Sequence, residues 1–259
     1  MEGTAEYFDF KTGPSLLELG EKNEDDQILV TVSKKEKISH DTYIYELEFP
    51  NPEWKSGLWV GGHFIFHAEI DGKWISRKYT PISPINQKGK ATLVIKIYRS
   101  NEEFPAGGKF TQHLENNVNV GDKILVEGPV GKVKYFGDGK FQFKKKELKK
   151  KSKVGLIAGG SGITPMYSIA QAASLAKEGL DVRMIFSNKT KDDILCKEQL
   201  DELEKINPNF KCFHTLTRHD AAKHGEWSGL TGRVSMDMLK QCGFPEPADD
   251  TLIALCGPS

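Results

Sequence analysis

The stretch AGGSGITPM, residues 158–166, places three glycines, a threonine and a proline directly after an apolar run. Thr164 fits the N-cap of a helix, and Pro165 fits the first helical position, where a missing amide hydrogen costs nothing. The open N–H groups at a helix start attract a diphosphate, and Gly159 and Gly160 carry no side chain to keep it away. The stretch therefore predicts a nucleotide site, although a glycine turn before a helix can also serve packing alone.

A second polar group, RKYTPIS at residues 77–83, follows a predicted strand in the first half of the chain. Arg77 can hold a phosphate through two parallel hydrogen bonds, and the ring of Tyr79 can lie on a planar heterocycle. The hydroxyl of Thr80 can hydrogen-bond the edge of that heterocycle. Taken singly, each residue is ordinary, and a tyrosine in this place is more often a core or rim aromatic.

A third group, FPAGGKFTQHL at residues 104–114, contains a second Gly-Gly turn that opens a short predicted helix. Lys109 and Thr111 lie at the start of that helix. Backbone N–H groups at a glycine turn form an anion cradle, so the first half of the chain carries a predicted anion site of its own.

The pattern of apolar residues changes once along the chain. Between residues 27 and 127, runs such as TYIYELEF and HFIFHAEI alternate apolar and polar residues, and glycine turns separate them. This alternation predicts an antiparallel barrel or sandwich. From residue 154 the runs VGLIA and VRMIFS are nearly continuously apolar and flank a helical segment, which predicts a parallel α/β sheet.

Composition excludes several functions. The 36 basic and 36 acidic side chains of the 259 residues cancel, so no overall field attracts nucleic acid or an anionic membrane. No apolar stretch reaches the length of a membrane span. Four cysteines without a Cys-x-x-Cys pair, and seven histidines without metal-ligand spacing, predict no metal site and reduced thiols in a cytosol-like compartment. The histidines are expected to be structural or exposed.

The domain boundaries follow from these changes in pattern. Residues 1–26 are expected to form a loosely ordered lead-in, residues 27–148 the barrel domain and residues 149–259 the α/β domain. Residues 140–153, KFQFKKKELKKKSK, hold eight lysines and one glutamate. A like-charged run of this kind is typical of a solvated linker, and it could also form a docking patch for an acidic protein.

Four of these stretches together resemble the ferredoxin-reductase-like flavoproteins, in the branch of NADH-cytochrome b5 reductases and nitrate reductase flavin domains. RKYTPIS is similar to the family's Arg-x-Tyr-Thr-x-x-Ser flavin motif, and AGGKFTQHL to its diphosphate turn. AGGSGITPM is similar to its nicotinamide-side turn, and LCGPS, at the end of the chain, to its Cys-Gly-Pro motif. Any one motif is weak, but the four occur in the family's order and spacing over residues 27–258.

The resemblance implies an N-terminal antiparallel flavin barrel and a nicotinamide-binding α/β domain, with FAD across their junction. It implies an oxidoreductase that takes hydride from NADH and passes single electrons to an acidic haem protein, cytochrome b5 first among the candidates. The alternatives are the flavin-reductase fragment of a nitrate reductase and a catalytically weakened FAD-binding accessory subunit. The expected location is the cytoplasm, or the cytosolic face of a membrane if an anchor is supplied elsewhere.

The resemblance also implies roles for individual residues. Arg77 would bind the FAD diphosphate and Tyr79 would pack on the flavin and its ribityl chain. The expected FAD-binding residues are Arg77, Tyr79, Thr80, Val94, Lys96, Tyr98, Gly108, Lys109, Phe110 and Thr111. The expected NADH-binding residues are Gly159, Gly160, Thr164, Pro165, Asp193, Gly257 and Pro258. Thr80 near flavin N5, Thr164 facing both rings and Cys256 near the nicotinamide would lie closest to the reaction.

Two of these assignments have an ordinary alternative. The carboxylate of Asp193 would receive the ribose 2′-hydroxyl and repel the extra phosphate of NADPH, but it could equally be an acidic residue at a helix start. Asp192, next to it, competes for the same role. By composition alone, Cys256 would be a buried structural thiol.

The chain departs from the family pattern at its end. Pro258 should begin a helix, yet the sequence stops at Ser259, which replaces the usual second proline. Relatives continue through a helix and a final strand. The resemblance therefore implies either an incomplete chain or a protein that has lost part of its hydride-transfer site.

Overall fold

The computed structural model describes residue 8 and residues 13–102, 104–176 and 179–258. These residues form two compact units, divided between Gly131 and Lys132. The barrel unit holds the described residues up to Gly131, apart from Phe8, which belongs with the remainder of the chain in the α/β unit. No helix among the described residues is long and apolar enough to span a bilayer.

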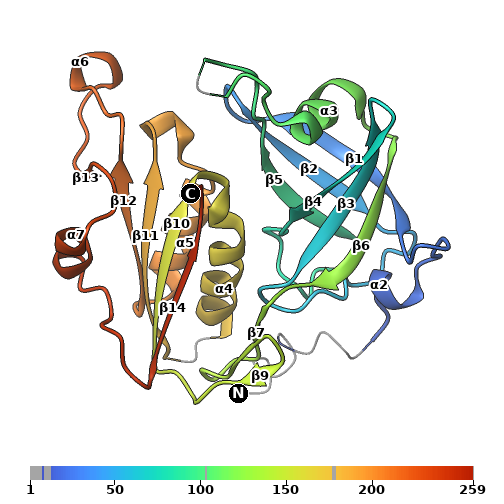
Figure 1. Cartoon of the computed structure of the whole chain (residues 1–259). Coiled ribbons are helices and arrows are strands. Elements are labelled where there is room, and N and C mark those ends of the chain that lie inside the picture. Colours follow the sequence, from blue (N-terminus) through green and yellow to red (C-terminus); the bar gives the residue numbers. More distant parts are fainter. Residues whose placement is uncertain (1–7, 9–12, 103, 177–178, 259) are drawn as a thin grey trace. The chain divides into compact units, whose positions relative to one another are not determined.

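The barrel unit is built on a six-stranded antiparallel sheet in the order β4-β3-β6-β1-β2-β5 (Figure 1). Its strands are β1 (Ile28–Lys37), β2 (Thr42–Glu48), β3 (His63–Ile70), β4 (Lys73–Tyr79), β5 (Lys90–Lys96) and β6 (Lys123–Val130). Its helices are α2 (Leu16–Leu19) and α3 (Lys109–Asn117). The hairpin between β3 and β4 turns at Asp71 and Gly72, which both have positive φ, as tight hairpin turns require. This turn fixes the pairing of Phe64 with Tyr79 and of Phe66 with Arg77.

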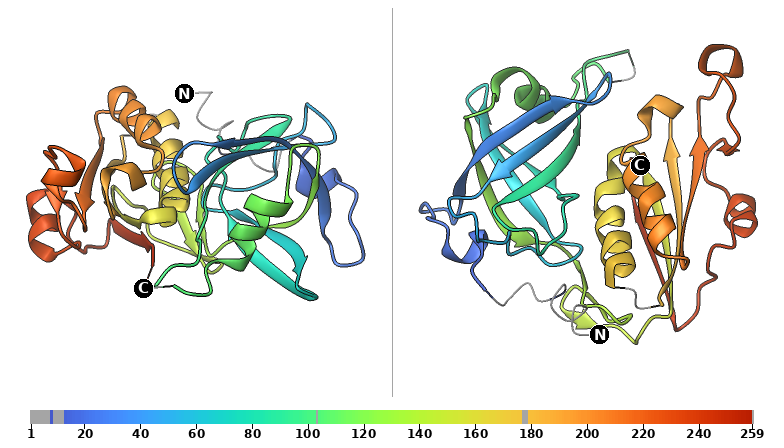
Figure 2. Two further views of the ribbon diagram at one scale, coloured as in Figure 1. Left: turned by 90° about the horizontal axis from the view of Figure 1, so that it is seen from above. Right: turned by 180° about the vertical axis from the view of Figure 1, so that it is seen from behind.

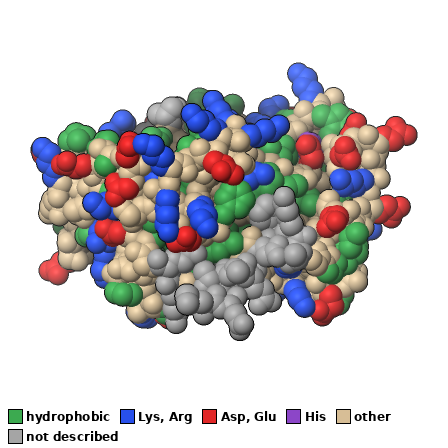
Figure 3. Space-filling model, turned by 90° about the horizontal axis from the view of Figure 1, so that it is seen from below, with side chains coloured by type: hydrophobic (Ala, Val, Ile, Leu, Met, Phe, Trp, Pro, Cys, Tyr) green, Lys and Arg blue, Asp and Glu red, His purple; other side chains and the backbone are tan. Residues whose placement is uncertain are grey.

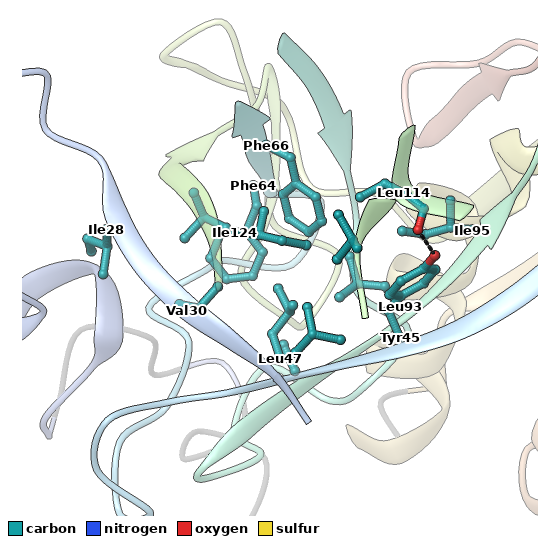
Figure 4. Packing of buried hydrophobic residues seen from close by; sticks show 14 of the residues in the cluster. Ile28, Val30, Tyr45, Leu47, Phe64, Phe66, Leu93, Ile95, Leu114 and Ile124 are labelled. Atoms are coloured by element: carbon teal, nitrogen blue, oxygen red, sulfur yellow. Dashed lines mark hydrogen bonds between the residues drawn. The ribbon is translucent and has the colours of Figure 1, made fainter. Parts of the chain in front are cut away.

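The core of the barrel unit consists of the apolar side chains that alternate along these strands (Figure 4). Phe64 and Phe66 of β3 are fully buried, as the alternation of HFIFHAEI predicts. Tyr45 is also fully buried, and its hydroxyl donates a 2.8 Å hydrogen bond to the Leu114 carbonyl of α3, drawn as the dashed line in Figure 4. Burial raises the pKa of Tyr45 well above its usual value, so the phenol remains protonated.

The α/β unit contains a five-stranded parallel sheet in the order β13-β12-β11-β10-β14. Its strands are β10 (Lys153–Gly159), β11 (Asp181–Asn188), β12 (Phe210–Leu216), β13 (Leu230–Thr231) and β14 (Thr251–Cys256). Its helices are α4 (Ile163–Ala176), α5 (Lys197–Ile206), α6 (Ala221–His224) and α7 (Met236–Gln241), and the short 3₁₀ turns are η1 (Gly160–Gly162) and η2 (Lys191–Asp193). Figure 2 shows α4 and α5 side by side on one face of the sheet. The antiparallel sheet and the parallel α/β sheet confirm the predicted fold class.

A small antiparallel sheet precedes the parallel one in the same unit. It consists of β7 (Val133–Tyr135), β8 (Phe141–Phe143) and β9 (Lys146–Glu147). Phe141 stacks on Tyr135 with ring centroids 4.4 Å apart, and Phe8 meets the same tyrosine edge-on at 5.1 Å. The three aromatic rings give this sheet a core of its own.

The segments expected as a linker and a lead-in differ from those expectations. The lysine-rich residues 140–153 include β8, β9 and the start of β10, and the compact units divide ahead of residue 148. Acidic residues of the same unit neutralise part of the run: Lys149 contacts Asp249 at 2.6 Å, and Lys150 contacts Asp138 at 2.6 Å. Figure 3 shows basic and acidic side chains interspersed on the face that it draws. Within residues 1–26, Leu16 of α2 is fully buried in the barrel core.

If residues 140–153 are an integral part of the α/β unit, truncating their buried aromatic will destabilise that unit. Phe141 is 2% exposed, whereas Phe143 on the same strand is 43% exposed. Phe141→Ala should lower the free energy of unfolding by about 3–5 kcal/mol in urea denaturation. Phe143→Ala, the matched control, should lower it by less than about 1 kcal/mol. Equal small losses would show that the segment is a linker after all.

Candidate active site

The flavin motif lies at the end of β4, an edge strand of the barrel unit. Arg77 is exposed, and its guanidinium donates a 2.8 Å hydrogen bond to the Ser76 carbonyl. The ring of Tyr79 packs against Phe66 at 4.7 Å and against Phe110 at 6.0 Å. Thr80 follows and is buried. The motif thus joins an exposed cation to an aromatic ring at the rim of the core.

A hydrogen-bonded chain across three strands fixes β4 next to this motif. The Ser76 hydroxyl lies 3.0 Å from Nδ1 of His67 on β3, and Nε2 of His67 lies 3.1 Å from the carboxylate of Glu127 on β6. Edge strands are held from one side only, so these side-chain bonds supplement the backbone ladder. No sequence pattern predicts these hydrogen bonds, because His67, Ser76 and Glu127 lie on separate strands.

The Gly-Gly turn before α3 has the features of an anion cradle. Gly107 has a φ of +59°, and the N–H of Gly108 donates to the Tyr98 carbonyl at 2.6 Å. A Cβ on Gly108 would lie 2.7 Å from Oγ1 of Thr111 and 3.0 Å from Cβ of Tyr98. No side chain caps the amino end of α3, so the positive end of the helix dipole is open to a ligand. These residues fit a diphosphate.

The side chains expected around that diphosphate have different roles. The Thr111 hydroxyl donates to the Gly108 carbonyl at 3.0 Å and accepts from the Tyr98 N–H at 3.1 Å, so it braces the turn. Phe110 is buried in the core, which leaves only its backbone for a ligand. The Lys109 ammonium is exposed and lies 3.1 Å from the Asp71 carboxylate. A shallow depression of about 210 Å³ beside it is lined by Ile70, Asp71, Lys109, Gln112, His113, Asn116 and Asn117.

The residues expected along the flavin edge lie on β5 and just beyond it. Val94 is buried, and Tyr98 is partly exposed. The ammonium of Lys96 forms a 2.7 Å ion pair with Asp41. Because the Lys96 ammonium is directed toward Asp41, a flavin edge at this position would contact the backbone of β5 instead of this side chain.

His63, at the start of β3, lies beside the flavin motif but is not among the FAD-binding residues expected from the sequence. Phe64 pairs with Tyr79, so His63 precedes this last pair of β3 and β4, at the end of the hairpin where Thr80 follows β4. Its Nε2 is buried without a hydrogen-bond partner, and burial, assisted by Lys78, lowers its pKa to about 4. The imidazole is therefore neutral at pH 7 and has an unused nitrogen beside the flavin motif. The only signal in the sequence was its place at the start of the strand that pairs with RKYT.

In the α/β unit, the glycine turn follows β10 but starts the helix earlier than predicted. The 3₁₀ turn η1 runs directly into α4, which begins at Ile163, so Thr164 is the second helical residue and not the N-cap. Its hydroxyl donates to the Ser161 carbonyl at 3.4 Å. Pro165 is the third helical residue, which is tolerated because the first four N–H groups of a helix lack partners inside it.

The Cys-Gly-Pro motif meets this turn at the carboxyl ends of β10 and β14. A Cβ on Gly162 would lie 2.2 Å from the Cys256 carbonyl, and one on Gly257 would lie 3.1 Å from Cα of Gly159. The two motifs therefore need glycine for their own contact. A Cβ on Gly159 would lie 3.1 Å from the Pro258 ring, whereas one on Gly160 would meet open space. Burial raises the pKa of the Cys256 thiol, which stays protonated at pH 7.

Asp193 caps the 3₁₀ turn η2. Its Oδ2 accepts hydrogen bonds from the Thr190 N–H at 3.0 Å and from the Thr190 hydroxyl at 2.8 Å. This is the helix-start role that the sequence left open for it, and the carboxylate is buried while Asp192 is exposed. The two hydrogen bonds from Thr190 fix the buried carboxylate in place.

Comparison with known proteins identifies both halves. Residues 29–135 match the family model described as the oxidoreductase FAD-binding domain, and residues 156–259 match the oxidoreductase NAD-binding domain. The chain is 39% identical over 234 residues to NADH-cytochrome b5 reductase 2 of Xenopus laevis, covering 87% of this chain and 77% of that protein. The chain belongs to the NADH-cytochrome b5 reductase and nitrate reductase branch of the ferredoxin-reductase-like flavoproteins.

Other members of the branch agree with this assignment. Human NADH-cytochrome b5 reductase 2 is 37% identical over 236 residues, covering 87% of this chain and 83% of its own length. The cytochrome b5 reductase domain of Ulva prolifera nitrate reductase superposes with a TM-score of 0.83 at 31% identity, over 92% of this chain and 90% of that domain. The match to the NADH nitrate reductase of Volvox carteri, at 36% identity, spans 86% of this chain but 26% of that protein.

These matches confirm the predicted family, enzyme class and cofactors. The protein is an NADH-dependent flavoprotein oxidoreductase that uses FAD. The uncapped start of α3 with its glycine turn fits the FAD diphosphate, and the open space beside Gly160 fits the approach of a dinucleotide.

Proposed function

We propose that this protein accepts hydride from NADH on its FAD and passes single electrons to an acidic haem protein, with cytochrome b5 the leading candidate. The bound flavin and nicotinamide supply the redox chemistry themselves, so the protein has to hold, orient and shield them. The relatives at 37–39% identity carry the name NADH-cytochrome b5 reductase, which supports the choice of acceptor.

One contact carries the proposed FAD site. The Tyr79 and Phe110 rings lie 6.0 Å apart, and this contact brings the end of β4 to the start of α3. The Arg77 guanidinium can then bind the diphosphate from one side while the N–H groups of α3 bind it from the other. Thr80 offers a hydroxyl to the flavin edge, and the neutral imidazole of His63 beside it offers a ring nitrogen for a hydrogen bond.

For the NADH site, we infer that Gly159, Gly160 and Thr164 border the nicotinamide and its diphosphate, with Cys256 at the side of the ring. A protonated thiol adds no charge there, which suits a ring whose charge changes during hydride transfer. Gly257 and Pro258 fix the position of Cys256 by packing against Gly159.

The central test is anaerobic reduction. Protein loaded with FAD and mixed with NADH in the absence of oxygen should lose its yellow absorbance within the mixing time of a stopped-flow instrument, and NADPH should act more slowly. An FAD-loaded protein that stays yellow with NADH would contradict the enzyme and favour an accessory subunit.

The preference for NADH is proposed to rest on the fixed carboxylate of Asp193. Asp193→Asn should reduce the ratio of kcat/KM for NADH over NADPH by on the order of tenfold, because the charge that repels a 2′-phosphate is lost. Asp192→Asn is the matched control and should leave this ratio near its original value. The opposite pattern would assign the ribose to Asp192.

The acceptor is proposed to dock on exposed lysines of the β8–β9 turn. Lys144, Lys145 and Lys146 are exposed there, next to the lysines already neutralised by aspartates. Opposite charges steer association, and the effect weakens as salt screens it.

Reversing two of these charges tests the docking surface. Lys144→Glu combined with Lys145→Glu should slow reduction of cytochrome b5 by on the order of tenfold at low salt, while the rate of flavin reduction by NADH stays unchanged. Lys205→Glu on α5 is the control. If both variants reduce cytochrome b5 equally fast, the acceptor docks elsewhere.

A second candidate is the flavin-reductase part of a nitrate reductase. The superposition on the Ulva prolifera domain and the 26% coverage of the Volvox carteri protein favour it. A haem or molybdenum domain encoded upstream in the transcript would decide for this candidate. For either candidate we propose a cytosolic setting, which agrees with the four free cysteines of the structure.

A further inference from the structure

The carboxyl end of α3 is held by side chains from strands that are distant in sequence. The Lys35 ammonium on β1 donates to the Glu115 carbonyl at 2.6 Å and to the Val118 carbonyl at 2.7 Å. The Tyr45 hydroxyl on β2 donates to the Leu114 carbonyl, as Figure 4 shows. Carbonyls at a helix end lack partners inside the helix, and a cation there also matches the helix dipole.

The side chain of Glu115 strengthens the same attachment. Its carboxylate accepts a 3.1 Å hydrogen bond from the Tyr43 hydroxyl and is bound by two nitrogens of Arg99. Arg99 also donates to the His40 carbonyl at 2.9 Å. The bonds from Arg99 lower the pKa of Glu115, so the acid is charged at pH 7. Residues from β1, β2 and the segment after β5 thus form hydrogen bonds with the carboxyl end of α3.

This attachment matters because the two ends of α3 are so different. A helix of nine residues is marginal by itself, so its direction is set by what holds it. The amino end begins at a glycine turn without a side-chain cap. A helix of this length is about 13 Å long, so a tilt of about 5° at its carboxyl end moves the amino end by about 1 Å. Displacements of this size weaken charge-assisted hydrogen bonds to a phosphate.

We propose that Lys35 is a positioning residue for FAD: by fixing the carboxyl end of α3, it aims the N–H groups of the amino end at the diphosphate. The proposal rests on the FAD site described above. Lys35 does not touch the ligand in this account, since it binds the opposite end of the helix. Tyr45 acts on the same end through its hydroxyl.

The proposal differs from a purely structural role in what it predicts for binding. If Lys35 only stabilises the fold, its loss lowers the unfolding temperature of the apoprotein but leaves the affinity for FAD unchanged. If it positions α3, its loss weakens FAD binding in the protein that remains folded and changes the surroundings of the phosphates.

Titrating FAD into the apoprotein and following flavin fluorescence gives the affinity, and ³¹P NMR of the bound FAD reports on the diphosphate. Lys35→Met should raise the Kd for FAD by about tenfold and shift the ³¹P resonances, while Lys35→Arg should recover most of the affinity. Lys34→Met is the matched control, since Lys34 is exposed and pairs with Glu36 at 2.7 Å. It should leave the Kd and the resonances unchanged.

A Lys35→Met protein that binds FAD with the original Kd and the original ³¹P shifts overturns the proposal, whatever its stability. Tyr45→Phe removes one hydroxyl from the same helix end and should raise the Kd by a smaller factor. It keeps the test decisive if Lys35→Met does not fold, and an unchanged Kd for Tyr45→Phe in that case also overturns the proposal.

Gly108→Ala separates this proposal from the FAD site on which it rests. The added Cβ meets Thr111 and Tyr98, so this variant should lose FAD affinity if the diphosphate lies at the turn. Normal binding by Gly108→Ala overturns the site and the positioning role together. Loss of binding by Gly108→Ala with normal binding by Lys35→Met overturns the positioning role alone.

Discussion

Both proposed dinucleotide sites depend on the electrostatic attraction of a helix start that no side-chain hydrogen bond caps. In the barrel unit, α3 follows the Gly107–Gly108 turn, and in the α/β unit, η1 and α4 follow Gly159. A side-chain cap would satisfy the first N–H groups and remove their attraction for a phosphate. The protein leaves these groups open and stabilises each helix by other means: α3 through its carboxyl end, and α4 through its burial against the parallel sheet.

The parts of the fold that sequence could predict are those whose signals are local. Alternation within HFIFHAEI places Phe64 and Phe66 in the core, and the continuous apolar run of VGLIA indicates a strand buried on both faces. Glycine turns are equally local, since their requirement for positive φ or close approach lies within a few residues. The four motifs are weak singly, but their order along the chain predicted the family, and comparison with known proteins confirmed it.

The parts that sequence could not predict are pairings between distant strands. The ion pair of Lys96 with Asp41 and the grip of Lys35 on α3 depend on strand order and register, which the alternation of apolar residues does not specify. The start of α4 was misplaced because a 3₁₀ turn replaced the expected N-cap. The lysine-rich run was interpreted as a solvated linker for a related reason: the aspartates that pair with its lysines include Asp249, about 100 positions away, and the local sequence does not show them.

The position of β4 at the edge of its sheet has a consequence for the protein before it acquires its flavin. An edge strand exposes backbone groups that can pair with another chain and begin aggregation. This strand carries Lys73, Arg77 and Lys78, all exposed, along its seven residues. A second copy approaching edge to edge would meet the same positive charges, so the arginine proposed to bind the FAD diphosphate also discourages self-association of the newly made polypeptide.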